Sequence, residues 1–183
     1  ARVITNIDIN SHLRIDLGLT YKQLTSKNYA IIDDLIGAEF HRDIDTFSET
    51  LNDVDGNVEK QAGDIFNYKY DFEGNMADLY AQLNLNYDKV NAFISGKYSM
   101  VSYQRNGLFK NERFQDNSIG ESESIEFSNW SGKSGLTYNI TGRHWATANV
   151  AYVNKAPLLQ NVFINPRENN TVVPNLQSEK ITS

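Results

Sequence analysis

Alternation of apolar and polar residues is the strongest constraint on the fold of this chain. In residues 77–88, apolar side chains occupy the odd positions up to Tyr87, and mostly polar ones occupy the even positions. A period of two is typical of a β-strand whose two faces meet different surroundings. With the tight Asp88-Lys89 turn and the strand-forming residues of 90–104 after it, this stretch predicts a β-hairpin. The pattern alone leaves open whether the apolar face meets a protein core or lipid.

The same alternation recurs along most of the chain. Residues 13–22, 66–73 and 144–152 each place apolar side chains on one face and mostly polar ones on the other. In 29–40, four apolar residues have helical spacing, so a short helix there is as compatible with the sequence as an irregular segment. The sequence predicts seven strands, at 2–9, 13–22, 66–87 with a bulge near Gly74, 90–104, 124–140, 144–156 and one that begins near 176.

The connections between these strands alternate in length. Short turns are predicted at Asn10-Ser11, Asp88-Lys89 and Thr141-Gly142-Arg143, and long polar stretches between them at roughly 23–65, 105–124 and 157–175. Outer-membrane barrels combine short periplasmic turns with long extracellular loops, whereas a soluble sandwich has no reason to sort its loops. Because such barrels must close, we expect residues 1–183 to form a single partial domain. The predicted fold is all-β, an antiparallel up-and-down meander that forms an arc of a larger barrel.

The composition excludes several classes of protein. No stretch approaches the ~18–20 apolar residues of a membrane-spanning helix, and there is no cysteine for a disulfide, a thiolate zinc site or a nucleophile. The net charge is −6 and the Lys and Arg residues are scattered, which argues against binding of nucleic acid. The mean hydropathy of −0.51 is compatible with a barrel, since barrel strands alternate.

No arrangement of residues predicts catalysis or a metal centre, so we expect no enzyme and no cofactor. His12, His41 and His144 are far apart, whereas a metal site needs several convergent ligands. Residues 53–64 have oxygen-bearing side chains at the ligand positions of an EF-hand loop, but Val58 stands where that loop needs glycine. A solvated loop rich in turns is the favoured interpretation of 53–64, and calcium binding is the alternative.

The stretch 103–117 holds the candidates for contact with a ligand. It mixes planar cations, amides and aromatic rings, which suits an oligosaccharide, a peptide or an anionic chelate. A solvated loop is the competing interpretation for any single residue, because few loop residues dominate binding. The candidate ligand-binding residues are Arg105, Asn106, Phe109, Lys110, Arg113 and Phe114.

Several short motifs carry a resemblance that covers nearly the whole chain. They are Gly135-Leu136-Thr137-Tyr138, Gly142-Arg143-His144, Lys155-Ala156-Pro157 and Asn165-Pro166-Arg167, preceded by hairpin-like stretches at 13–40 and 77–99. Together they resemble the barrel of Bacteroidetes-type TonB-dependent outer-membrane receptors. The resemblance implies a plugged barrel of about 22 strands in contact with outer-membrane lipid.

The resemblance also implies a function. Such receptors import a scarce nutrient, such as siderophore-bound iron, cobalamin, an oligosaccharide or a peptide. Energy comes from the TonB complex through a region N-terminal to the barrel, which is not visible in these residues.

On this interpretation Asp88-Lys89 lies at the periplasmic rim and Leu79, Leu83 and Leu85 face lipid. The even-numbered polar residues then face the lumen beside the plug: Asp78, Gln82, Asn84 and Asn86. The alternative is a soluble antiparallel β-sandwich or lipocalin-like module that binds a small ligand or a glycan. Its strands would alternate in the same way, with the apolar face turned inward.

Overall fold

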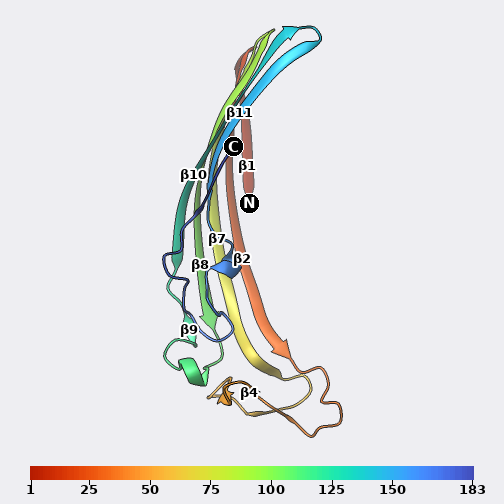
Figure 1. Ribbon diagram of the computed structural model, residues 1–183, viewed down its shortest axis with the longest axis vertical. Coiled ribbons are helices and arrows are strands. Elements are labelled where there is room, and N and C mark those ends of the chain that lie inside the picture. The colour runs from red at the N-terminus through yellow and green to blue at the C-terminus, as the bar shows by residue number, and fades with distance from the viewer.

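The computed structural model describes residues 1–183 and shows one long, curved antiparallel sheet with loops gathered at one end (Figure 1). The strands lie in the order β1-β2-β7-β8-β10-β11-β12, so β1 and β12 form the two edges and the sheet is open. This confirms the predicted antiparallel meander of about seven strands. The strands are β1 Arg2–Asn10, β2 Leu13–Ile31, β7 Ile65–Asn86, β8 Val90–Gly107, β10 Ile125–Thr141, β11 His144–Lys155 and β12 Glu179–Thr182.

Short elements lie in the connections. The strand pairs are β3 (His41–Arg42) with β6 (Glu59–Lys60) and β4 (Ile44–Asp45) with β5 (Thr50–Leu51), while β9 (Gly120–Glu121) pairs with β8. The two 3-10 helices are η1 (Glu112–Phe114) and η2 (Leu159–Asn161). Neither has the length or the apolar run of a membrane-crossing helix.

The structure corrects the expectations for 29–40 and for Gly74. No helix forms at 29–40, because β2 continues to Ile31 along β7 and a turn follows in which Ile36 has a φ of +51°. Gly74 is not bulged but pairs regularly with Leu24 and Tyr103. The irregularity lies farther along, where two residues of β7 fall between the partners of Tyr29 and Ala30.

The sheet divides into two halves along its strands. The turn half lies beside the tight turns and contains 13–21, 77–86, 90–100 and 128–141, with β1 and β11. The loop half lies beside the long loops and contains 22–31, 65–76, 101–107 and 125–127.

The apolar residues of β7 change faces between the two halves. In the turn half they are odd-numbered and uncovered, with Leu79 59% and Leu83 38% exposed. In the loop half they are even-numbered and buried, as Tyr70 and Phe72 show. Because Gly74 keeps the register, every even-numbered side chain from Tyr70 to the end of β7 points to the same face. We call this face inner and the opposite face outer.

The inner face of the turn half is a polar network. Arg14 pairs with Asp16 at 2.7 Å (Nε to Oδ1), and Asp16 accepts a hydrogen bond from Asn84 at 2.7 Å (Nδ2 to Oδ2). Gln82 donates to Asn84, also at 2.7 Å, and Tyr80 donates to Gln82. These side chains satisfy one another across two strands, so this face needs no apolar cover.

The inner face of the loop half carries the apolar core. Four of its side chains, Tyr70, Phe72, Val101 and Phe127, pack with two residues of the β11–β12 connection. These two are Val162, which is fully buried, and Phe163, whose ring stacks on Phe72 with 5.4 Å between centroids. The β11–β12 connection is therefore anchored on the inner face of the sheet.

Candidate functional site at the loop end of the sheet

Three long loops meet at one end of the sheet, opposite the tight turns (Figure 1). The first loop is 32–64, the second 108–124 and the third 156–178. The alternation of short and long connections predicted from the sequence is confirmed. Because all three loops lie at one end, their side chains form one composite surface.

Arg105 ties the second and third loops to the sheet. It is 1% exposed, and its guanidinium donates to the carbonyl oxygens of Pro166 (2.7 Å) and Ser118 (3.0 Å). It also donates to the Asn170 side chain and lies 5.2 Å from the centre of the Tyr70 ring. Burial lowers the pKa of Arg105 to about 10, so the side chain stays cationic at neutral pH. Its Nε and Nη1 donors are occupied within the chain.

Backbone and carboxylate hydrogen bonds join the first loop to the second. Val54 N–H donates to the Lys110 carbonyl at 2.9 Å, and Lys110 N–H donates to Asp53 Oδ1 at 3.2 Å. Leu51 N–H donates to Glu112 Oε2 at 2.6 Å. These contacts pair two segments about sixty residues apart and hold them side by side.

Arg113 joins all three loops. Its guanidinium lies 3.3 Å from Asp45 Oδ2 in the first loop and 3.5 Å from Glu168 Oε2 in the third. The same group lies over the Phe114 ring at 5.2 Å. Its side chain is 40% exposed, so solvent or a ligand can reach it.

The six candidate residues do not converge on one point. Arg105 is buried and Arg113 is exposed at the surface between the loops. Asn106 pairs with Asp71 and Glu121 within the sheet, and the Phe109 ring lies 5.6 Å from the Lys60 ammonium. The other two, Lys110 and Phe114, lie in the second loop with half-buried side chains. Their role as ligand contacts stays a prediction.

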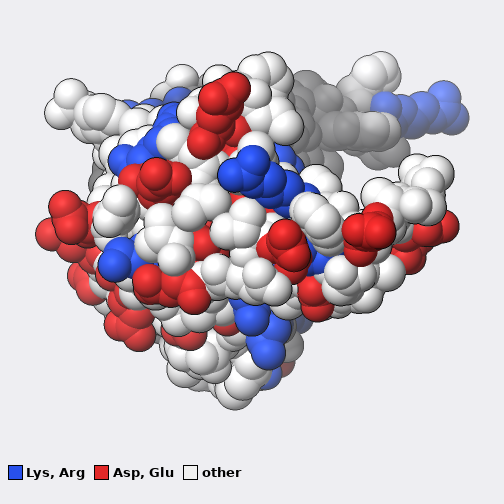
Figure 2. Space-filling view, turned by 90° about the horizontal axis from the view of Figure 1, so that it is seen from below, with Lys and Arg blue, Asp and Glu red and all other residues white.

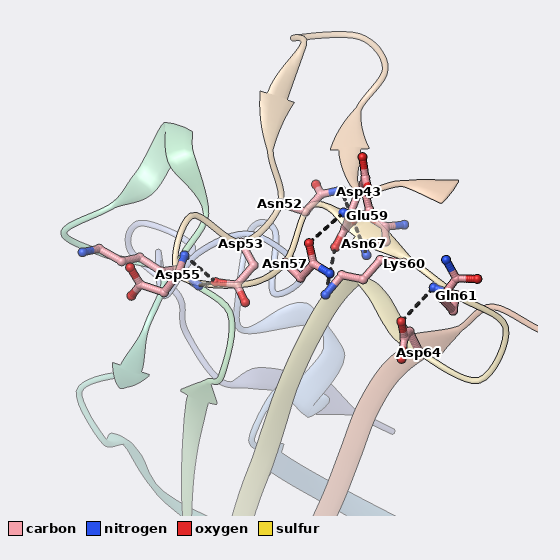
Figure 3. A network of polar contacts seen from close by, with 11 residues as sticks. Asp43, Asn52, Asp53, Asp55, Asn57, Glu59, Lys60, Gln61, Asp64 and Asn67 are labelled. Carbon is pink, nitrogen blue, oxygen red and sulfur yellow. Dashed lines mark hydrogen bonds and ion pairs between the residues drawn. The ribbon is translucent and has the colours of Figure 1, made fainter. Parts of the chain in front are cut away.

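The acidic stretch 53–64 does not gather its side chains around one point (Figure 3). Asp53 accepts from Asp55 N–H at 3.3 Å, and Asp64 accepts from Gln61 N–H at 2.7 Å at the other end of the stretch. The structure contains no group of three or more His, Asp or Glu side chains placed to hold a metal ion. Asp53, Asn57 and Asp64 each accept a hydrogen bond from a backbone N–H two or three residues away, as side chains in turns do.

Asp43 is a buried carboxylate that no sequence pattern singles out. It is 2% exposed and accepts from Asn52 Nδ2 at 2.8 Å and from Asn67 N–H at 2.9 Å, both at Oδ1 (Figure 3). The Lys60 ammonium lies 3.9 Å from its other oxygen. Asp43 thus links the first loop to the start of β7.

A cleft of about 420 Å³ opens between the first loop, the start of β7 and the third loop. Phe47 stands at this cleft and is 98% exposed. The cleft walls combine rings, amides, two carboxylates and a guanidinium. They include Phe47, Phe66, Asn67, Asn165, Arg167 and Glu168.

The negative charge of the protein is concentrated in the loops. The three loops hold 15 acidic and 5 basic residues, a net charge of −10, while the whole chain carries −6. Acidic side chains are accordingly spread over the loop end of the molecule (Figure 2). The remainder of the chain carries a net charge of +4.

A second hollow, of about 710 Å³, lies on the inner face where the third loop begins. Residues 156–158 form one side, and Tyr80, Lys97 and Lys133 are among the residues of the sheet that line it. Lys97 pairs with Asp78 at 3.1 Å. The lining of this hollow therefore combines charged side chains with apolar ones such as Phe93 and Val153.

One comparison with known proteins decides the family. The family model for the TonB-dependent receptor-like β-barrel matches residues 4–183, almost the full length. The chain belongs to the TonB-dependent receptor family. No curated protein and no solved structure matches it.

Family membership fixes the general function of this receptor barrel. Receptors of this family lie in the bacterial outer membrane and import nutrients in partnership with TonB; they are transporters and not enzymes. The alternative of a soluble sandwich or lipocalin-like module is wrong, because the sheet is open and no second sheet packs on it.

Proposed function

We propose that this chain forms part of the wall of a receptor barrel of the Bacteroidetes type. The outer face of the turn half contacts lipid, and the inner face of the sheet points to the lumen. The tight turns then lie at the periplasmic rim and the three loops lie outside the cell. There the loops receive a scarce nutrient, which is siderophore-bound iron, cobalamin, an oligosaccharide or a peptide.

The inversion of apolar faces between the two halves carries this proposal. A strand needs about 9–11 tilted residues to cross the membrane, and the apolar outer stretch of β7, 77–86, has this length. Beyond it the outer side chains of β7 are Asp71, Glu73 and Asn75, which hydrocarbon would not accept. The loop half therefore suits water outside the membrane, where apolar side chains must turn inward.

Aromatic side chains support the same boundaries. Tyr21 is 48% exposed on the outer face where the two halves meet. Tyr87 and Tyr138, 52% and 45% exposed, lie at the opposite margin near the tight turns. Barrels carry such aromatic girdles at both membrane interfaces.

The candidate ligand residues differ in the role that their surroundings favour. Arg113 and Phe114 lie at the exposed junction of the loops and suit direct contact with a nutrient. Arg105 suits a positioning role, since its donors already bind the second and third loops. The other three candidates are half-buried, so neither direct contact nor a positioning role is favoured for Asn106, Phe109 or Lys110.

A matched pair of arginine substitutions in the intact receptor tests the orientation. Leu83→Arg places a charge on the outer face and should cost about 2–4 kcal/mol if that face meets the hydrocarbon core. The adjacent Asn84→Arg places the same charge on the inner face and should be tolerated. Outer-membrane assembly, measured by heat-dependent migration on a gel, should fall for Leu83→Arg alone. Equal tolerance of both substitutions would contradict the proposal.

A further inference from the structure

We infer that the cleft beside Phe47 binds a neutral, polyhydroxylated ligand, namely a sugar ring of an oligosaccharide stacked on the Phe47 ring. This inference rests on the proposed placement of the loops outside the cell. Of the four nutrient classes proposed above, the chemistry of this cleft favours the oligosaccharide.

The cleft has the size and construction of a small-molecule site. Its volume of about 420 Å³ lies within the range of roughly 300–1,000 Å³ that is usual for ligand pockets. Its walls come from three segments that are distant in sequence, around 44–47, 66–67 and 165–168. Arg113 holds the first and third together through Asp45 and Glu168. The walls therefore keep their places before a ligand arrives.

Phe47 offers a ring that nothing in the chain covers. It is 98% exposed, yet its backbone is fixed, because its N–H donates to Asp45 Oδ1 at 2.8 Å. A single exposed aromatic residue is ordinary on a protein surface. One that is held at the mouth of a polar cleft provides an apolar platform, and an aromatic face of this kind suits the C–H face of a sugar ring.

Polar groups around the platform are available for hydroxyl groups. The side-chain amides of Asn67 and Asn165 make no hydrogen bond within the chain, although their backbones do. Glu168 also lines the cleft: its Oε2 is covered and lies 3.5 Å from Arg113, while the side chain as a whole is 24% exposed. Amides both donate and accept, and a carboxylate accepts, which matches hydroxyls that can do both.

Charge separates this ligand class from the others. The net charge of −10 on the three loops repels an anionic chelate. At the cleft, however, two arginines balance the carboxylates of Asp45 and Glu168. Arg113 pairs with both from outside the lining, and Arg167, in the lining, lies over the Tyr68 ring at 4.8 Å. A cleft without net charge gives a cationic peptide no local partner, so a neutral ligand fits best.

Binding to the purified intact receptor tests the inference. The probes are short neutral gluco-, manno-, xylo- and galacto-oligosaccharides, with oligogalacturonate, a lysine-rich peptide and a ferric catecholate chelate as charged comparisons. We expect a neutral oligosaccharide to bind, and Phe47→Ala to raise its Kd at least about tenfold, the loss equivalent to about 1.4 kcal/mol. Phe47→Tyr keeps the ring and should stay within about threefold of wild type.

Ile36→Ala is the matched control, since Ile36 is 92% exposed on the first loop but does not line the cleft. It should leave the Kd unchanged. Binding of a charged probe alone, binding of no neutral sugar, or equal effects of Phe47→Ala and Ile36→Ala would each overturn the inference. The proposed orientation would survive any of these results, because the Leu83→Arg and Asn84→Arg pair measures assembly without a ligand.

Discussion

The turn half and the loop half of the sheet share the same strands but bury opposite faces. In the turn half the inner face is a hydrogen-bonded polar network and the outer face carries uncovered leucines such as Leu79. In the loop half the inner face holds Tyr70 and Phe72 beneath the third loop, and the outer face is polar, with charges of both signs such as Lys27 and Asp71. One continuous backbone ladder runs through both halves.

The difference shows that the surroundings and not the backbone determine which face is apolar. In the proposed orientation lipid covers the apolar outer face, so the turn half needs no protein core. In water the same sheet must cover its apolar side chains, and the third loop supplies that cover with Val162 and Phe163. The third loop of this receptor is therefore part of its folded core as well as of the proposed ligand surface.

Removing the cover of the loop half should have the largest effect. Phe163 is 3% exposed, and truncating a buried phenylalanine costs about 3–5 kcal/mol. In the intact receptor, Phe163→Ala should raise amide hydrogen exchange across 156–178 on the order of a hundredfold or more. Heat-dependent migration on a gel should not change, because the turn half is untouched.

Phe47→Ala provides the comparison for this experiment. It removes an equally large ring that is 98% exposed, so exchange across 156–178 should stay as in wild type. If the two variants exchange alike, the third loop is not held by the apolar core, and the contrast between the halves fails.

Alanine substitutions at two glycines of β8 compare the two halves through a smaller structural change. A Cβ at Gly107 in the loop half would lie 1.7 Å from the Ser118 carbonyl oxygen and 2.6 Å from Arg105 Nη1. A Cβ at Gly96 in the turn half would meet nothing within 4 Å. Gly107→Ala should therefore destabilise the second loop by about 1–3 kcal/mol, seen as faster exchange across 108–124, while Gly96→Ala should not. Equal exchange in both variants would show that the second loop does not pack closely on the sheet.

Sequence patterns predicted the turn half well because one face of its strands is apolar and the other polar, so the period of two is visible. Strand boundaries there agree with the structure to within one residue: β2 begins at 13 as predicted, and β7 ends at 86 where 87 was predicted. In the loop half, β2 was expected to end at 22 but reaches Ile31. Its continuation through Gln23 to Asn28 is almost wholly polar on both faces, which hides the period of two.

The candidate site was predicted only in part, for a related reason. Arg105 and Arg113 were singled out as candidates from their chemistry, but their partners Pro166 and Glu168 lie more than fifty residues away in the sequence. Phe47 could not be predicted as a ligand contact, because one aromatic residue in a polar loop forms no sequence pattern. Only the folded arrangement shows that it stands at a cleft.

The smallest predicted effect concerns Asp45, whose carboxylate orders the β4–β5 hairpin that carries Phe47. The backbone hydrogen bond from Phe47, followed by bonds from Ser48 and the charge of Arg113, lowers the pKa of Asp45. A carboxyl with a lowered pKa stabilises the fold above its unfolded pKa, and this contribution is lost as pH falls through the folded value. Protection of 44–51 from hydrogen exchange should therefore fall modestly between pH 6 and pH 3. Asp45→Asn should show weaker protection at pH 6 and little change on acidification; if it keeps the wild-type pH dependence, another carboxyl orders the loop.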